Sequence, residues 1–167
     1  MPSGWHLKKN YMNYKPRLML PDLKISVLNP ADDTPVPAAE WMRRDDKESA
    51  EWLLIEVALP QFIFKLHKKE QGTLSWFEAV SKSEAAGGRA GTRAELLALY
   101  DARFGHGLNE ILDAIGGDPI RGWYWTQEED ADPQYSATSA WYVSLSNGYV
   151  INYAKTNGFQ VRLISAF

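Results

Sequence analysis

The stretch Trp123–Phe167 constrains the fold more than any other part of the chain, because strand-like runs and turn signals alternate along it. Two such runs, Ala140–Leu145 and Tyr149–Tyr153, are separated by Ser146-Asn147-Gly148. Asn-Gly is a strong hairpin signal, since both residues tolerate the positive φ of a type I′ turn. A third run, Phe159–Ile164, follows a second Asn-Gly turn. We therefore predict a three-stranded antiparallel meander at the C-terminal end of the sequence.

The two faces of this predicted sheet differ in character, because successive strand residues point to opposite sides. If Val150 points to the core, Tyr149, Ile151 and Tyr153 lie outward beside Tyr142. An outward face of Tyr, Asn, Ser and Gln suits recognition, since Tyr gives a large contact area at low entropic cost. The spacing leaves a second interpretation open, in which these aromatic side chains only pack an ordinary sheet.

Composition narrows the classes of function. The 167 residues are enough for one domain with a sizeable core, and a net charge of −3 gives no electrostatic case for nucleic-acid binding. No apolar run approaches the roughly 20 residues that span a bilayer, and no secretory signal is visible at the N-terminus. The absence of Cys excludes disulfides, thiolate metal sites and Cys nucleophiles. We expect cytoplasmic synthesis without a signal peptide, and this leaves open a final place on a virion or displayed at a surface.

The first half of the chain predicts strands. Lys24–Leu28, Trp52–Leu59 and Phe62–Leu66 are short apolar runs, and Pro60 requires a bend or an edge between the last two. Before them, residues 1–20 form a basic aromatic arm, which we interpret as a loosely docked terminus or as a contact for a partner chain.

Helix signals follow the strands. Ser75-x-x-Glu78 and Thr92-x-x-Glu95 are capping boxes, each of which predicts a helix start. The apolar spacing of Leu108–Ile115 predicts a third helical segment. Strands, then helices, then strands indicate an α+β fold.

No catalytic constellation rises above background in this sequence. The three His residues lack the spacing of a metal site, and no G-x-S-x-G or G-x-G-x-x-G motif occurs. The acidic run Glu128–Asp132 could bind calcium through carboxylate oxygens, but it lacks the EF-hand pattern and suits a solvated loop. We therefore predict no catalytic residue, no metal site and no cofactor.

Several motifs occur together, in order, from Ser75 onward. They are Ser75-Trp76-x-Glu78-Ala79, Gly87-Gly88-Arg89, Thr92-Arg93-x-Glu95, Trp123-Tyr124-Trp125-Thr126, Ala140-Trp141-Tyr142-Val143, Ser146-Asn147-Gly148 and the terminal Val161-Arg162-x-x-x-Ala166-Phe167. In this order the chain resembles C-type-lectin-fold domains, and in particular the variable proteins of bacterial and phage diversity-generating retroelements. Ala90-Gly91 and Gln127-Glu128 depart from the family pattern, and the Glu-Pro-Asn and Trp-Asn-Asp calcium signatures of C-type lectins are absent.

The resemblance implies a C-type-lectin-like fold with two to three short helices packed on antiparallel strands. Residues 21–167 would form one domain, with 21–70 as opening strands or a small β extension and 71–167 as helices and C-terminal sheet. The resemblance also implies a scaffold that includes Trp125, Trp141, Val143, Val161 and Leu163. Its ligand-facing positions match Gln134, Tyr135, Tyr142, Ser144, Asn147, Tyr149, Ile151, Asn152, Tyr153, Asn157, Phe159 and Gln160.

Three functions remain as expectations. The first is a non-enzymatic, calcium-independent binding protein that takes a protein or glycan ligand on another cell or a virion. The second is a structural or receptor-binding subunit of a phage or cell surface, in which the basic arm contacts neighbouring chains of a homo-oligomer. The third is an enzyme or calcium-dependent lectin that uses Glu128–Asp132. Fold alone does not decide among them.

Overall fold

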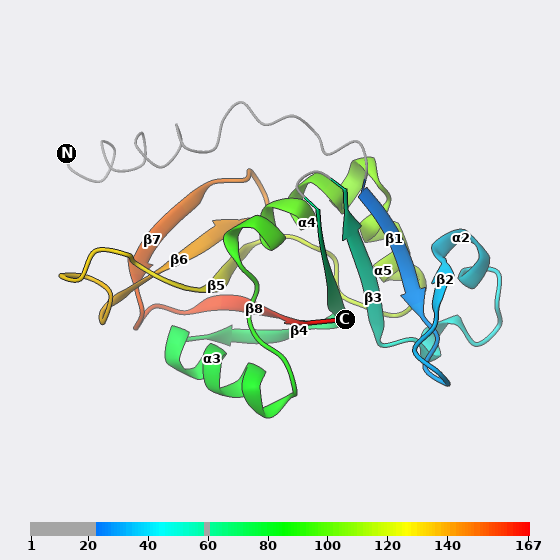
Figure 1. The fold of residues 1–167 in the computed structure, drawn as a ribbon, viewed down its shortest axis with the longest axis horizontal. Helices are drawn as coiled ribbons and strands as arrows, with labels where there is room; N and C mark the ends of the chain where they lie inside the picture. The colour runs from blue at the N-terminus through cyan, green and yellow to red at the C-terminus, as the bar shows by residue number, and fades with distance from the viewer. Residues whose placement is uncertain (1–22, 59–60) are drawn as a thin grey trace.

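The computed structural model describes residues 23–58 and 61–167, so the predicted arm of residues 1–20 lies outside the described residues. Within them, four α-helices and one eight-stranded sheet form a mixed fold (Figure 1). The α+β class predicted from the sequence is confirmed. None of the helices in this part of the chain has the length and apolar character needed to cross a membrane.

A single sheet forms the frame of the molecule (Figure 1). Its strands are β1 (Leu23–Leu28), β2 (Pro35–Pro37), β3 (Trp52–Val57), β4 (Phe62–Leu74), β5 (Trp123–Glu129), β6 (Ser139–Ser144), β7 (Val150–Ala154) and β8 (Phe159–Ser165). They lie in the order β2-β1-β3-β4-β8-β5-β6-β7, with β2 and β7 at opposite edges. Neighbouring strands are antiparallel except β5 and β8, which run parallel where Tyr124 meets Gln160.

The helices are α2 (Ala38–Trp41), α3 (Trp76–Ala85), α4 (Arg93–Gly105) and α5 (Leu108–Ala114). Both predicted capping boxes are confirmed. The Ser75 hydroxyl accepts from the Glu78 amide at 3.3 Å, and the Thr92 hydroxyl accepts from the Glu95 amide at 3.1 Å. Because these side chains satisfy amides that have no partner inside the helix, they fix where α3 and α4 begin.

Helices cover both faces of the sheet. The α4–α5 side buries Leu96, Leu99 and Leu112 with strand residues such as Ile55 and Val143. On the other side, α3 contributes Ala79 to a smaller core that contains Trp125 and Val161. Figure 1 shows α3 and α4 on opposite sides of the sheet. We call these two faces the α4 side and the α3 side.

The predicted C-terminal meander is wrong in one connection. Strand β7 pairs with β6, but β8 does not pair with β7 and instead lies between β4 and β5. Burial explains this placement, because Val161 and Leu163 on one face of β8 are as deeply buried as Arg162 and Ile164 on the other. A strand that is apolar or enclosed on both faces needs a central position with neighbours on each side.

The Ser146-Asn147-Gly148 turn joins β6 to β7 as predicted, but it is not a type I′ turn. Of the Asn-Gly pair only Gly148 has a positive φ, of 81°. The Ser144 amide donates to the Tyr149 carbonyl at 2.8 Å, so residues 145–148 form a four-residue loop. The Asn147 side-chain oxygen accepts from the Tyr149 amide at 3.1 Å, which holds this loop in a longer turn than the dipeptide alone suggests.

Two further boundaries differ from the sequence-based expectation. Strand β4 extends to Leu74, well beyond Phe62–Leu66, through register shifts against β8 and a Gly72 at φ 106°. The segment 31–39, for which the sequence analysis predicts no strand or helix, contributes β2 and the start of α2. Polar residues in β4 and prolines in β2 hide both from a periodicity analysis, because pairing with neighbouring strands decides these elements.

Candidate functional site

Five aromatic side chains from β5, β6, β7 and β8 meet on the α3 side of the sheet. Phe159 stacks on Tyr142 with ring centroids 4.3 Å apart, and it meets Trp125 edge to face at 4.7 Å. Tyr153 contacts Tyr142 at 6.2 Å, and Trp123 contacts Tyr142 at 6.1 Å. We call this set the aromatic cluster: Trp123, Trp125, Tyr142, Tyr153 and Phe159.

Strand register assembles the aromatic cluster. Trp125 lies opposite Tyr142, and Tyr142 in turn lies opposite Ile151. Alternation then brings Trp123 and Tyr153 to the same face. Phe159 joins them because β8 lies beside β5. The indole Nε1 of Trp125 donates to the Leu74 carbonyl at 2.9 Å, which fixes the orientation of this ring beneath the others.

The aromatic cluster has a buried floor and an open rim. Tyr142 and Phe159 are 7% and 9% exposed, whereas Trp123 and Tyr153 are 52% and 49% exposed. Beside Trp123 is a shallow depression of about 270 Å³. Its lining residues are Thr73, Gly122, Trp123, Gly158, Phe159 and Gln160. The arrangement offers rigid apolar surface next to polar groups, as binding sites commonly do.

The hydroxyl of Tyr142 stays protonated in this setting. Burial raises its pKa above the ordinary value, and the neighbouring Tyr153 raises it further. A neutral phenol both donates and accepts a hydrogen bond. The buried floor of the aromatic cluster is therefore uncharged at Tyr142.

The predicted alternation in β6 and β7 holds, but the predicted exposure does not hold for four residues. Tyr142, Ile151 and Tyr153 do share one face. Tyr142, Ser144, Ile151 and Phe159 are each at most 9% exposed, so the expectation that they lie open to a ligand is wrong. The rings of the cluster cover one another, and Ser144 lies directly across from Trp123 in the β5–β6 register.

Among the predicted ligand-facing residues, Asn152 lies away from the aromatic cluster, whereas Gln160 lines the depression beside Trp123. Asn152 pairs with Trp141 on the α4 side, and its Nδ2 donates to Asp130. The Gln160 amide Nε2 donates to the Glu70 carboxylate at 2.8 Å, and its oxygen accepts from the Trp123 amide at 3.1 Å. Both side chains therefore have structural partners.

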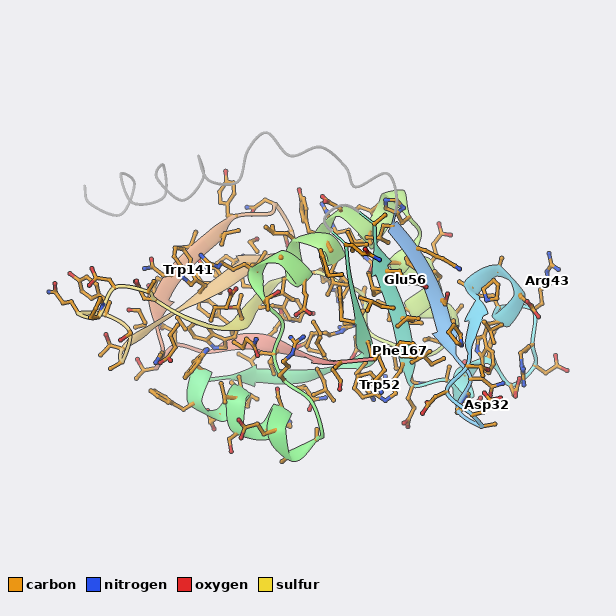
Figure 2. The ribbon with its side chains drawn as sticks, in the orientation of Figure 1. Asp32, Arg43, Trp52, Glu56, Trp141 and Phe167 are labelled. Carbon is orange, nitrogen blue, oxygen red and sulfur yellow. The ribbon has the colours of Figure 1, made fainter. Side chains whose placement is uncertain are left out.

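The remaining predicted residues lie around the sheet. Gln134 and Tyr135 are exposed in the connection from β5 to β6, with Tyr135 46% exposed. Asn147 is exposed in the β6–β7 loop, and Asn157 is half-buried between β7 and β8. Tyr149 is half-buried and packs against the core of the α3 side. Trp141 lies at the opposite end of the molecule from Asp32 and Arg43 (Figure 2).

The acidic run Glu128–Asp132 is not a single loop, because β5 continues through Glu129. Glu128 accepts from Arg93 at 3.2 Å, Glu129 pairs with Lys155, and Asp130 accepts from Asn152. Each carboxylate thus turns to a different partner. Among residues 23–58 and 61–167, no group of three or more His, Asp or Glu side chains is arranged to hold a metal ion.

Two residues of this region escaped the sequence analysis. Trp123 shares a face with Trp125 by simple alternation, so the Trp-Tyr-Trp spacing was a usable signal. Lys155 follows β7 and is only 2% exposed. The sequence around Lys155 does not indicate that it is buried, because its partners lie elsewhere in the chain. They are Glu129, Ser136 and Trp76.

Comparison with known proteins identifies no relative of this chain. No protein-family model matches the chain, and no curated protein matches it either.

Proposed function

We propose that this chain is a non-enzymatic binding protein that holds a macromolecular ligand against the aromatic cluster. The observation that carries the proposal is the open rim formed by Trp123 and Tyr153 over a rigid, buried floor of Tyr142 and Phe159. Large aromatic side chains fixed by their neighbours lose little entropy on binding and supply most of the energy at protein interfaces. The ligand would be a protein or a glycan on another cell or a virion.

We further propose a C-type-lectin-like fold of the kind used by variable proteins of diversity-generating retroelements. Support comes from the motifs that carry the resemblance. The two capping boxes begin α3 and α4, and the Trp-Tyr-Trp-Thr and Ala-Trp-Tyr-Val motifs lie side by side in β5 and β6. Binding would be independent of calcium, since the acidic run is engaged in separate ion pairs and hydrogen bonds.

The proposal is tested by mixing the tagged protein with a panel of bacterial cells and measuring bound protein by flow cytometry. A Trp123→Ala, Tyr153→Ala double variant should lose binding to any recognised strain by about thirtyfold or more, because removing a hot-spot anchor costs at least about 2 kcal/mol. Phe104→Ala is the matched control, since Phe104 is 73% exposed on α4, on the opposite side of the sheet. Undiminished binding by the double variant would overturn the proposal.

The genomic context tests the retroelement part separately. DNA near the gene should contain a near-identical repeat of the segment that encodes Trp123–Phe167, differing mainly at adenines, beside a reverse transcriptase gene. Absence of both would remove diversification from the proposal and leave the binding face to be judged by the cell experiment.

A further inference from the structure

Lys155 is a buried cation whose charge has three favourable contacts. An ammonium group carries three N–H donors and no acceptor. Its Nζ donates to the Glu129 carboxylate and, at 2.7 Å, to the Ser136 carbonyl. The Trp76 indole faces the same Nζ at 4.2 Å from the ring centroid, which gives the charge a third favourable contact.

The main chain of Lys155 joins the same elements. Its amide donates to the Thr138 carbonyl at 2.8 Å, and its carbonyl accepts from the Trp76 amide at 2.9 Å. Residue 155 therefore connects three parts of the chain: the end of β7, the start of α3, and the loop from β5 to β6. We call the last of these, residues 130–138, the 130–138 loop.

The 130–138 loop has little else to hold it in place. None of its residues is buried, so it contributes no side chain to either core. Its internal hydrogen bonds form turns around Asp132 and Tyr135. Only Ser139, the first residue of β6, joins it to the sheet by main-chain bonds within the same connection: the Asp130 amide donates to the Ser139 carbonyl at 3.0 Å, and the Ser139 amide donates to the Tyr135 carbonyl at 2.8 Å. The hydrogen bond from the Asn152 side chain to the Asp130 carboxylate holds only the first residue of the loop. Apart from the bond to Ser139, the C-terminal half of the loop is hydrogen-bonded to the rest of the protein at Ser136 and Thr138, in both cases by Lys155.

We propose that Lys155 is a positioning residue that fixes the 130–138 loop, with the exposed Gln134 and Tyr135, at the border of the binding face. The inference rests on the proposed function for what the loop contacts, but not for how the loop is held. Lys155 follows the exposed Tyr153 by two residues, so one segment carries both a rim residue of the aromatic cluster and the cation that places the loop.

The test measures amide hydrogen exchange and needs no ligand, so it can fail without the binding proposal failing. In Lys155→Met, which keeps the apolar stem and removes the charge, the amides of Tyr135, Ser136 and Ser139 should exchange at least tenfold faster. The amide of Val143 in β6 should keep its rate. Lys82→Met is the matched control, because Lys82 also donates to a carbonyl, that of Gln71 at 2.7 Å, from an exposed position.

A second variant keeps the test decisive if Lys155→Met does not fold. Glu129→Gln removes one charge of the ion pair at a side chain that is 49% exposed, and it should raise loop exchange by a smaller factor without changing the midpoint of thermal unfolding. Chymotrypsin cleavage after Tyr135, measured against cleavage after the exposed Phe104 in the same digest, should rise in parallel. Loop exchange and cleavage equal to wild type, or a uniform increase at all amides, would overturn the inference.

Discussion

At the scale of single residues, polar groups enclosed in the sheet matter for the stability of the fold. Arg162 is 1% exposed, and its guanidinium donates to the Lys68 carbonyl at 3.1 Å and to the Asp118 carbonyl. The Tyr124 hydroxyl lies 3.5 Å from the same guanidinium and 3.5 Å from the Glu70 carboxylate. Because Arg162 and Tyr124 are buried, they depend on these partners for hydrogen bonds.

Replacing Arg162 with Met should therefore lower the free energy of unfolding by about 3 kcal/mol, since the Lys68 and Asp118 carbonyls each lose a hydrogen bond from a buried, charged donor. Urea denaturation measures this. Arg43→Met is the control, because Arg43 is exposed and points away from the protein (Figure 2), and it should change stability by less than about 0.5 kcal/mol. Equal effects of the two changes would contradict the role given to Arg162.

The raised pKa of Tyr124 predicts how the free energy of unfolding depends on pH in the alkaline range. Burial raises its pKa to about 12, from an ordinary 10.0, so the folded state holds the phenolic proton more tightly than the unfolded state. The neutral form is favoured in the fold, so this contribution is fully present below pH 10 and is lost as pH rises from about 10 to 12. Denaturation curves across that window should show falling stability. Tyr124→Phe should flatten the fall in part only, because burial also raises the pKa of Tyr142.

Residue patterns predicted which side of a strand a side chain takes, but not whether it is exposed. Period two correctly placed Tyr142, Ile151 and Tyr153 together. It could not show that Phe159 and Trp125 would cover Tyr142, because those rings arrive from β8 and β5. Lys155 is the extreme case, since every group around its ammonium is distant in sequence.

At the scale of elements, the helix caps were the reliable signals. Both capping boxes specify helix starts through contacts three residues apart, and such contacts can be read from sequence. Strand pairing depends on partners elsewhere in the chain. The proposed meander failed for that reason, since β8 bypasses its neighbour β7 to pair with β4 and β5.

The cap of α3 gives an element-scale prediction. Ser75→Ala removes the acceptor for the Glu78 amide and should lower the free energy of unfolding by about 1 kcal/mol. Ser81→Ala is the control, because Ser81 is exposed within the same helix and Ala favours helix. Thermal unfolding monitored by circular dichroism should show a lower midpoint only for Ser75→Ala. A cap variant as stable as wild type would show that packing alone fixes the start of α3.

At the scale of the whole molecule, β4 and β8 join the two parts of the sheet. Strands β1 to β3 lie on one side of this pair, and β5 to β7 lie on the other. The core of the α4 side also crosses the join, since it contains Ile55 from β3 and Val143 from β6. A shared core and an unbroken sheet favour a single cooperative unit.

Native-state hydrogen exchange should therefore give the same opening free energy for the Ile55 and Val143 amides, within about 0.5 kcal/mol, and both should match the value from urea denaturation. A clearly lower value for Ile55 would mean that the strands before residue 70 unfold separately, as a β extension would.

The central position of β8 also affects which strands can pair while the chain is being synthesised. Among the strands of residues 23–58 and 61–167, Phe159–Ser165 is synthesised after the other seven, yet β4 and β5 have no common neighbour until it arrives. Until then the nascent chain holds two incomplete sheets, each with an edge that can pair with the wrong partner. Chaperones that shield extended edges should therefore be needed most before Phe159–Ser165 becomes available for pairing, and a chain truncated just before Phe159 should be the species most prone to aggregate.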